Sequence, residues 1–504
     1  MRAFTAVRTT GVFCLPGCAG RPKPENTRRF ELAAAAEAAG YRACLRCRPY
    51  RIPASLDWTA GPELVCRAVH MVIDGTLHGG LDGRGEDQLA RALRVCPRDL
   101  RRLLALHTGA TPDQLARSCA SHFARRLLDD TDLPPAQVAL ASGFGAVRQL
   151  DSACREIFGE PPLALRARRR RTDPLVAGDG LPLRLSFRGP LDFDAMLSYF
   201  RARAIPGVEH VNDTCYRRTV VVDGAPGVLE FTRAGGREDQ LILRAHLARL
   251  QGLIHVVARA RRIFSLDAPC QETARCLAGD PIIGPLARGR PGLRVPGSWD
   301  AYETGVRAII GQQVSVAGAS TLIGRLARQV GEQVPGLERF GLSHSFPPPE
   351  VLATADLSRV GLTRARQSAI QAFAGAVIRG EIALNRSAPL TDLVDAITAV
   401  RGLGPWTAQY IALRLGERDA FPSGDLGLRR AIGQLQPAGS ASLQELAESW
   451  SPWRATAAIQ LWSADSALER GQAPRCACVP LPAQGRELDG AAPRRGPGDH
   501  VERP

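Results

Sequence analysis

A chain of 504 residues, of which 45% are hydrophobic, is long enough for about three or four domains that each bury a core. No apolar run of about 18 residues and no signal-peptide pattern occurs, which excludes a membrane protein and gives no indication of export. The formal net charge of +15 favours a polyanionic partner, although the positive charge is spread along the whole chain.

Four cysteines near the start of the chain have the spacing of a metal site. Cys14 and Cys18 form a C-x3-C pair, and Cys44 and Cys47 form a C-x2-C pair further along. Four thiolates suit one tetrahedral Zn²⁺ ion, and the pattern by itself indicates a structural zinc module. The spacing differs from that of the four-cysteine iron–sulfur loop of some glycosylases, so we expect no iron–sulfur cluster.

The residues around these cysteines, AVRTTGVFCLPGC and AGYRACLRCRP, resemble the N-terminal domain of the Ada methylation-response regulators over residues 1–52. The resemblance implies that Cys14 is both a zinc ligand and the acceptor of a methyl group from a DNA phosphotriester. Zinc-bound thiolates are deprotonated yet nucleophilic, which suits this role. The family domain begins some residues before the segment that matches Phe4, so we expect either a truncated start or a weakened domain.

Two pairs of amphipathic helices follow, each with the break of a helix-turn-helix. Gln88–Leu106 breaks near Pro97, and Gln137–Phe158 turns at Gly143–Gly145. With the segments ASGF and FGEPP, residues 60–168 resemble the AraC-type DNA-binding domain. Taken singly, an arginine here is more often a solvated surface charge than a base contact. The resemblance implies promoter contacts from Arg98, Arg101 and Arg102 in the first unit, and from Arg148, Gln149, Ser152 and Arg155 in the second.

The basic run RARRRR at Arg166–Arg171 predicts a mobile linker that extends to Gly180. Residues 182–295 then resemble the N-terminal α+β domain of the AlkA alkyl-base glycosylases, and we expect this domain to support the fold without chemistry of its own. Alternating apolar residues predict strands at Leu181–Arg188, Cys215–Val222 and Leu241–Ala245, and helices at Phe193–Ala204 and Leu247–Arg262.

A glycine-rich turn between two amphipathic helices is the centre of residues 296–482. In VRGLGPWTA, Gly402 and Gly404 can adopt positive φ and precede a helix N-terminus, whose free N–H groups attract phosphate. The pattern resembles the helix-hairpin-helix of base-excision DNA glycosylases. This resemblance implies that Gly402, Gly404 and Thr407 contact DNA.

Asp425, in FPSGDLGLRR, lies where the GPD segment of the same family has its catalytic aspartate. An aspartate before a helix is also a good N-cap. The two roles can coexist, because a helix N-terminus favours the ionised carboxylate that would face a sugar cation. The resemblance implies that Asp425 stabilises this cation or orients water during hydrolysis of the N-glycosidic bond.

Aromatic residues are expected to form the base pocket. Trp406 and Tyr410 lie on one helix face, and Trp462 matches a third aromatic of the AlkA pocket. An aromatic stripe at helical spacing is more often core, but the resemblance implies that these rings attract a cationic alkylated base. In GQQVS, Gln312 and Gln313 match a DNA-invading loop, and Gln313 occupies the wedge position, where a surface amide is the alternative.

The only lysine in the sequence is Lys23, far from this half of the chain. A Schiff-base lyase needs an amine, so we expect a monofunctional glycosylase. A PCHR-type segment is absent, and no second methyltransferase activity is expected.

The expected fold class is multidomain and mainly α with α+β parts, in the order zinc domain, tandem helix-turn-helix, α+β domain and all-α glycosylase domain, with a disordered tail at 483–504. The expected function is excision of alkylated bases of the 3-methyladenine type by a glycosylase fused to a methylation-sensing transcription regulator. Its expected partners are alkylated double-stranded DNA, promoter DNA and RNA polymerase, in the bacterial cytoplasm at the nucleoid. The alternative is a transcription activator whose glycosylase half only binds DNA.

Overall fold

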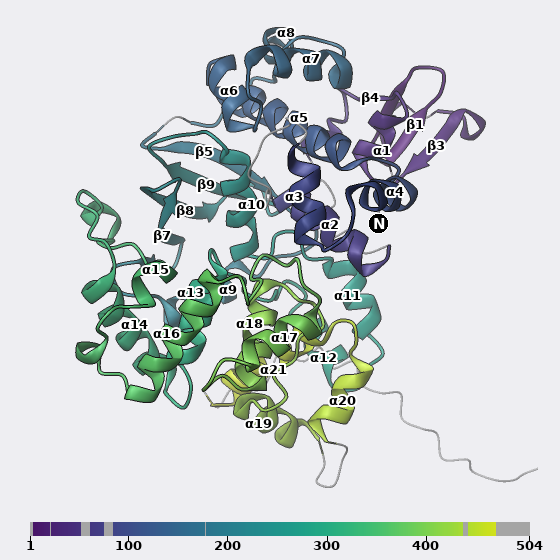
Figure 1. Ribbon diagram of the computed structural model, residues 1–504. Coiled ribbons are helices and arrows are strands. Elements are labelled where there is room, and N and C mark those ends of the chain that lie inside the picture. The colour runs from purple at the N-terminus through teal and green to yellow at the C-terminus, as the bar shows by residue number, and fades with distance from the viewer. Residues whose placement is uncertain are drawn as a thin grey trace, which may run out of the picture.

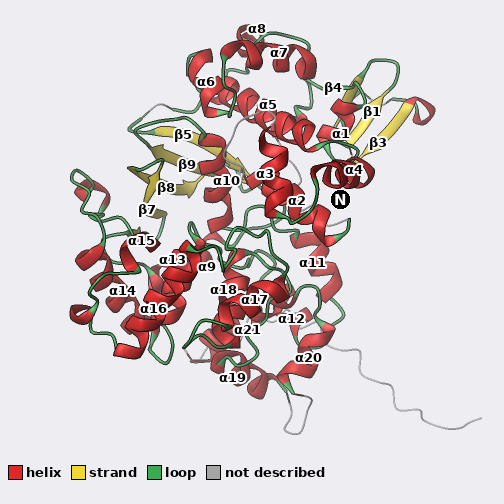
Figure 2. Cartoon of the chain, viewed as in Figure 1, coloured by secondary structure: helices red, strands yellow, loops and turns green. Residues whose placement is uncertain are grey.

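The computed structural model describes residues 4–20, 22–51, 61–74, 84–176, 178–436 and 442–469. The predicted tail at 483–504 lies outside these ranges. Helices predominate, and two sheets are present among the described residues, which confirms the predicted multidomain fold class (Figure 2). The first sheet and the helices α5 to α8 lie at one end of the molecule, the helical C-terminal part lies at the other, and α2 lies between them (Figure 1). No helix in the described ranges is long and apolar enough to cross a membrane.

A small sheet carries the N-terminal cysteines. Its strand order is β3-β1-β2-β4, with β2 and β4 parallel and the other pairs antiparallel. Phe4 and Phe13 meet edge to face in its core. The elements are β1 (Phe4–Val7), β2 (Val12–Cys14), the 3-10 helix η1 (Pro24–Asn26), β3 (Thr27–Phe30), α1 (Ala33–Ala38), β4 (Arg42–Ala43) and η2 (Pro49–Arg51).

Both predicted helix-turn-helix units are present, with their breaks at the expected places. Cys96 caps the second helix of the first unit, and residues 142–146 separate the helices of the second. A long helix that the sequence reading did not single out, α5, joins the units, and Thr111 and Gln114 form a capping box at its start. The elements are α2 (Glu63–Asp74), α3 (Arg84–Ala92), α4 (Pro97–Thr108), α5 (Pro112–Asp130), α6 (Pro135–Ala141), α7 (Val147–Phe158) and α8 (Pro162–Ala167).

The prediction of a mobile basic linker is wrong for the described residues around 166–176. The arginines are held by acids and carbonyls of the neighbouring domains, so the run connects the domains through defined contacts. A charge run is mobile when it is only solvated, but here four of the arginines have partners within the protein. The contacts include Arg166 with the carbonyl of Leu133, Arg168 with Glu160, Arg169 with Asp132, and Arg170 with the carbonyl of Arg46.

The third part is a five-stranded antiparallel sheet in the order β5-β9-β8-β7-β6. The three predicted strands are confirmed, whereas β6 and β8 were missed. β6 is short, and β8 has Pro226 and Gly227 as its second and third residues, which weaken a strand pattern. The elements are β5 (Leu181–Ser186), α9 (Phe193–Arg203), β6 (Glu209–Val211), β7 (Cys215–Val222), β8 (Ala225–Arg233), β9 (Gln240–His246) and α10 (Leu253–Ile263).

The C-terminal part is all helical apart from loops. α13 and α16 approach closely, since a Cβ on Gly305 would lie 2.3 Å from the ring of Phe373. The elements are α11 (Cys270–Leu277), α12 (Ile283–Gly289), α13 (Ala301–Ile310), α14 (Val316–Val330), η3 (Glu338–Phe340), α15 (Pro349–Leu352), η4 (Ser358–Val360), α16 (Arg364–Ile378), α17 (Leu390–Thr398), α18 (Pro405–Leu415), α19 (Leu426–Leu435), α20 (Leu443–Ser449) and α21 (Arg454–Glu469).

Candidate active site and nucleic-acid interface

The predicted hairpin connects α17 to α18. Gly402 has φ +91°, a left-handed conformation that favours glycine, whereas Gly404 is extended and forms the N-cap of α18. Gly404 is exposed, and a Cβ built on it would meet no atom within 4 Å. The first N–H groups of α18 have no partner within the helix and lie beside this open face. The hairpin therefore presents backbone donors at a surface that a phosphate can approach.

Changing Gly404 to Asp is expected to weaken binding to any DNA duplex by about tenfold or more, because the new carboxylate would meet a phosphate at short range. The extended backbone accepts a side chain, so the fold should survive. Gly404→Asn is the matched control, since it adds the same volume without charge. Fluorescence anisotropy at several salt concentrations measures the affinities, and equal affinities of the two variants would count against a phosphate at this position.

The side chains of Thr407 and Gln312 bind each other. Thr407 is 2% exposed, and its hydroxyl accepts a hydrogen bond of 2.9 Å from Nε2 of Gln312. Packing in the core turns the hydroxyl inwards, so the DNA contact of Thr407 stays a prediction that would use its backbone. Only the backbone N–H of Thr407 remains available at the helix N-terminus. Gln313, in contrast, is exposed at the loop tip and has φ +54°.

Asp425 has two structural roles at once. It is the N-cap of α19, and its Oδ1 accepts from the backbone N–H groups of Gly427 and Leu428 at 2.9 and 3.1 Å. The indole Nε1–H of Trp462 also donates to Oδ1 at 2.8 Å, and that of Trp406 donates to Oδ2 at 3.0 Å.

A carboxylate oxygen has two lone pairs in its plane, so Oδ2, with a single donor, keeps room for a further partner. Two backbone N–H groups and two indole N–H groups thus donate to the carboxyl group of Asp425. The arrangement therefore holds a negative charge in a defined orientation, with one oxygen open to a ligand.

The three predicted aromatic residues of the base pocket do lie together. Trp406 and Tyr410 stack with ring centroids 5.5 Å apart and planes at 15°, and Tyr410 meets Trp462 edge-on at 6.1 Å. All three side chains are half-buried. The sequence suggested their shared cleft, but it carried no signal that the two indoles also orient Asp425, since Trp462 lies on a helix distant in the chain.

Two further residues, Arg414 and Tyr199, contact Tyr410 and were not predicted from the sequence. Arg414, one turn along α18 from Tyr410, donates from Nη1 to the hydroxyls of both Tyr410 and Tyr199 at 3.0 Å. Tyr199 belongs to α9 in the preceding domain. Burial alone would raise the pKa of Tyr410, but the positive charges of Arg414 and Arg203 outweigh it and lower the pKa to about 8. The contacts of Tyr410 thus join two domains.

Replacing Trp462 with Phe keeps an aromatic ring and removes one donor to Asp425. We expect base release to slow by about tenfold to a hundredfold, with little change in DNA affinity, because a hydrogen bond to a charged group is worth about 1.5–3 kcal/mol. Single-turnover rates measure this effect. If the loss comes from the carboxylate, adding Trp462→Phe to Asp425→Asn should cause no further loss; an additive loss would contradict the assignment.

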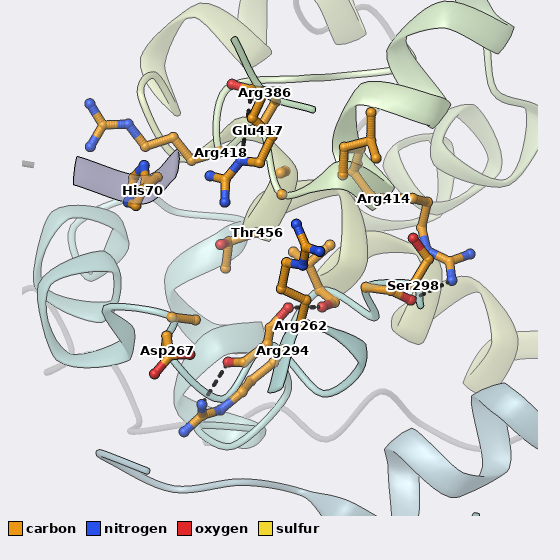
Figure 3. A pocket seen from close by; sticks show the side chains of 18 of the residues that line it. His70, Arg262, Asp267, Arg294, Ser298, Arg386, Arg414, Glu417, Arg418 and Thr456 are labelled. Atoms are coloured by element: carbon orange, nitrogen blue, oxygen red, sulfur yellow. Dashed lines mark hydrogen bonds and ion pairs between the residues drawn. The ribbon is translucent and has the colours of Figure 1, made fainter. Parts of the chain in front are cut away.

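A cavity of about 850 Å³ lies elsewhere, between α2, the loops around residues 265 and 295, and the C-terminal end of α18. Arg262, Arg386 and Arg418 gather around Thr456 in it, with His70 from α2 nearby (Figure 3). Arg414 borders the cavity, whereas Trp406, Asp425 and Trp462 are not among its lining residues. The predicted base-pocket residues therefore lie outside this cavity.

The four cysteines of the first sheet form the metal site that the sequence predicted. The Sγ atoms of Cys14, Cys18, Cys44 and Cys47 all lie within 4.8 Å of one another. A tetrahedral Zn²⁺ with bonds of about 2.3 Å places its sulfur ligands about 3.8 Å apart, so these residues fit one zinc ion. The N–H of Leu15 donates to Sγ of Cys47 at 3.4 Å, a contact that helps to orient this ligand.

The predicted promoter-reading residues are all exposed, on α4 and α7. Some are engaged within the protein: Arg101 pairs with Glu86 at 2.9 Å, and the Gln149 side chain accepts from the N–H of Gly145 at 2.9 Å. Such surface pairs are weak and exchange readily for phosphate. The remaining members are Arg98, Arg102, Arg148, Ser152 and Arg155, of which Arg102 lies 3.8 Å from Asp99 and Arg155 lies 2.8 Å from Asp151.

Four domain families match the chain. They are the metal-binding domain of Ada at residues 1–50, a helix-turn-helix domain at 89–168, the AlkA N-terminal domain at 182–300, and the HhH-GPD superfamily of base excision DNA repair proteins at 306–455. The fold and site thus define a helix-hairpin-helix DNA repair protein joined to an Ada-type zinc domain and a helix-turn-helix domain.

The full-length relatives define the family more closely. A protein of Mycobacterium tuberculosis strain H37Rv, described as "Probable bifunctional transcriptional activator/DNA repair enzyme AlkA", is 38% identical over 91% of this chain and 92% of its own length. DNA-3-methyladenine glycosylase 2 of Escherichia coli K12 is 33% identical over 55% of this chain and 95% of its own length. The chain belongs to the family of bifunctional transcriptional activator and DNA repair proteins of the AlkA type.

Proposed function

We propose that the chain is a monofunctional DNA glycosylase that excises alkylated bases of the 3-methyladenine type and is fused to a methylation-sensing transcription regulator. The observation that carries the catalytic part is the carboxylate of Asp425, held by the indole N–H groups of Trp406 and Trp462 beside the hairpin. An anchor that only binds DNA has no need for an oriented charge in an aromatic pocket.

In this proposal the hairpin holds the DNA backbone and Gln313 enters the gap left by the displaced nucleotide. The damaged base then lies among Trp406, Tyr410 and Trp462, whose ring faces attract the positive charge of an alkylated ring. Asp425 faces the sugar, with Oδ2 directed at C1′ or at the attacking water.

The bond that breaks is the one between C1′ and the ring nitrogen. Its electron pair goes to the base, which leaves neutral because alkylation had made it cationic. Asp425 stabilises the positive charge that develops on the sugar, and a fixed negative charge costs no reorganisation at that moment. Water adds to C1′ and loses a proton, which gives an abasic site.

The product is an intact strand with an abasic site, because strand cleavage through a Schiff base needs an amine. The single lysine, Lys23, lies in the zinc domain, and none follows it in the sequence. The enzyme is therefore expected to leave strand scission to other activities.

The N-terminal half is the sensor in this proposal. Cys14 accepts the methyl group of a DNA phosphotriester, and Cys14, Cys18, Cys44 and Cys47 hold the zinc ion. The exposed residues of α4 and α7 read promoter DNA, and RNA polymerase is the target of activation. These partners place the protein in the bacterial cytoplasm, at the nucleoid.

Base release from methylated DNA by the full chain tests the enzyme. Purified protein is incubated with duplex DNA alkylated on its purines, the free bases are identified by mass spectrometry, and alkali reveals abasic sites as strand breaks. We expect release of 3-methyladenine and strand breaks only after alkali. Tight DNA binding without base release would favour the alternative, an activator whose glycosylase half serves as an anchor, and breaks before alkali would contradict a monofunctional enzyme.

A further inference from the structure

The loop that carries Gln313 is tied to the hairpin by the side chain of Gln312. Its Nε2 donates to the hydroxyl of Thr407 at 2.9 Å and to the carbonyl of Gly402 at 3.3 Å. A carbonyl can only accept, so the contact with Gly402 requires the nitrogen end of the amide to face the hairpin. One side chain thus joins the two DNA-facing loops, the one before α14 and the one before α18.

A second contact holds the same residue from the other side. The guanidinium of Arg366, in the first turn of α16, donates from Nη2 to the backbone carbonyl of Gln312. α16 is itself packed against α13 through Gly305 and Phe373. Both the backbone and the side chain of Gln312 therefore have hydrogen-bond partners within the domain.

The residue that follows has an unusual backbone. Gln313 has φ +54°, in the left-handed region, and its side chain is exposed. Such a conformation in a residue other than glycine costs about 1 kcal/mol or more and persists only where neighbouring contacts impose it. The hydrogen bonds of Gln312 lie one residue before Gln313. They are therefore the contacts that can hold Gln313 in this conformation, with its side chain exposed.

We propose that Gln312 is a positioning residue that couples the hairpin to the inserted loop, so that Gln313 is presented to the base stack in one geometry once the hairpin has docked on the backbone. The inference rests on the proposed glycosylase function. It replaces the expected DNA contact of Gln312 with an internal role. In this coupling, the hydroxyl of Thr407 on the hairpin accepts the hydrogen bond from Gln312.

Removal of this coupling is expected to impair nucleotide flipping and to leave DNA binding intact. If Gln313 is inserted up to about 1 Å away from its proper position, the rate of base release falls by up to about a hundredfold. We expect Gln312→Ala to lower single-turnover base release from a paired lesion by about tenfold or more. Its affinity for undamaged duplex should stay within about threefold of the wild type, because the backbone donors of α18 are untouched.

The test uses the full chain with two substrates and a matched pair of variants at position 407. One substrate has the lesion paired in duplex, and the other has it opposite an abasic site, where little stacking must be disrupted. Thr407→Val removes the hydroxyl at constant volume, and Thr407→Ser keeps it. Fluorescence of 2-aminopurine next to the lesion reports flipping, and thermal unfolding reports folding.

We expect Gln312→Ala and Thr407→Val to be slow on the paired lesion and near normal on the lesion opposite the abasic site, with Thr407→Ser active on both. The double variant Gln312→Ala/Thr407→Val should be no slower than either single variant. Equal losses on both substrates, a fully active Thr407→Val, or additive losses would each overturn the coupling. Absence of base release by the wild type on either substrate would instead refute the proposed function.

Discussion

Asp425→Asn is expected to abolish base release while DNA binding persists. Asparagine keeps the shape and can still cap α19 through its oxygen, but it carries no charge to stabilise the sugar cation. Its amide NH₂ would also occupy the place of Oδ2 and face the indole N–H of Trp406, which is another donor. We expect the single-turnover rate to fall by about a thousandfold or more, since fixed charges in such sites contribute a large share of catalysis.

Glu448→Gln is the matched control, because it removes one negative charge at an exposed position on α20. The measurements are the rate of base release from methylated duplex and the affinity for the same DNA. Near-normal turnover by Asp425→Asn would remove Asp425 from the mechanism and leave it as a helix cap only.

The second large effect is expected at the zinc site, where methylation of Cys14 should strengthen promoter binding. Four thiolates and Zn²⁺ carry a net charge of about −2, and conversion of one thiolate to a thioether raises this to about −1. At roughly 6–8 Å from a phosphate and an effective dielectric near 20, one charge is worth about 2–3 kcal/mol. Salt screening halves this, which leaves about a tenfold gain in affinity.

The zinc domain contacts both the connecting segment and the second helix-turn-helix unit. Arg48 follows the zinc ligand Cys47, is buried, and pairs with Asp173 of the connecting segment at 2.6 Å. Gly159, at the end of α7, lies against the guanidinium of Arg42 in β4. The zinc domain and the second helix-turn-helix unit are therefore in direct contact, so a new phosphate contact by one adds to the binding of the other.

The experiment measures the promoter affinity of the full chain before and after incubation with DNA that contains methylphosphotriesters. Mass spectrometry locates the methyl group, and Cys14→Ala should abolish its transfer. Cys276→Ala, at an exposed thiol outside the zinc site, is the control. A methyl group on another cysteine, or an unchanged affinity after methylation of Cys14, would rule out the switch.

The amino-acid sequence by itself determined the order of the domains and the local motifs. The cysteine pairs, both helix-turn-helix breaks and the hairpin lie where the spacing placed them, and Trp406 and Tyr410 share a face because residues four apart on a helix are neighbours. These features depend on backbone periodicity and on contacts between residues close in the chain, which a pattern can express.

Only the tertiary structure decided which partner each polar side chain has. Trp462 donates to Asp425 from a different helix, Tyr199 comes from another domain, and Gln312 donates to Thr407 of the hairpin. The arginines of the connecting segment are ordered for the same reason. Buried donors and acceptors must be satisfied by whatever packing brings within about 3 Å, and sequence spacing does not specify that neighbour.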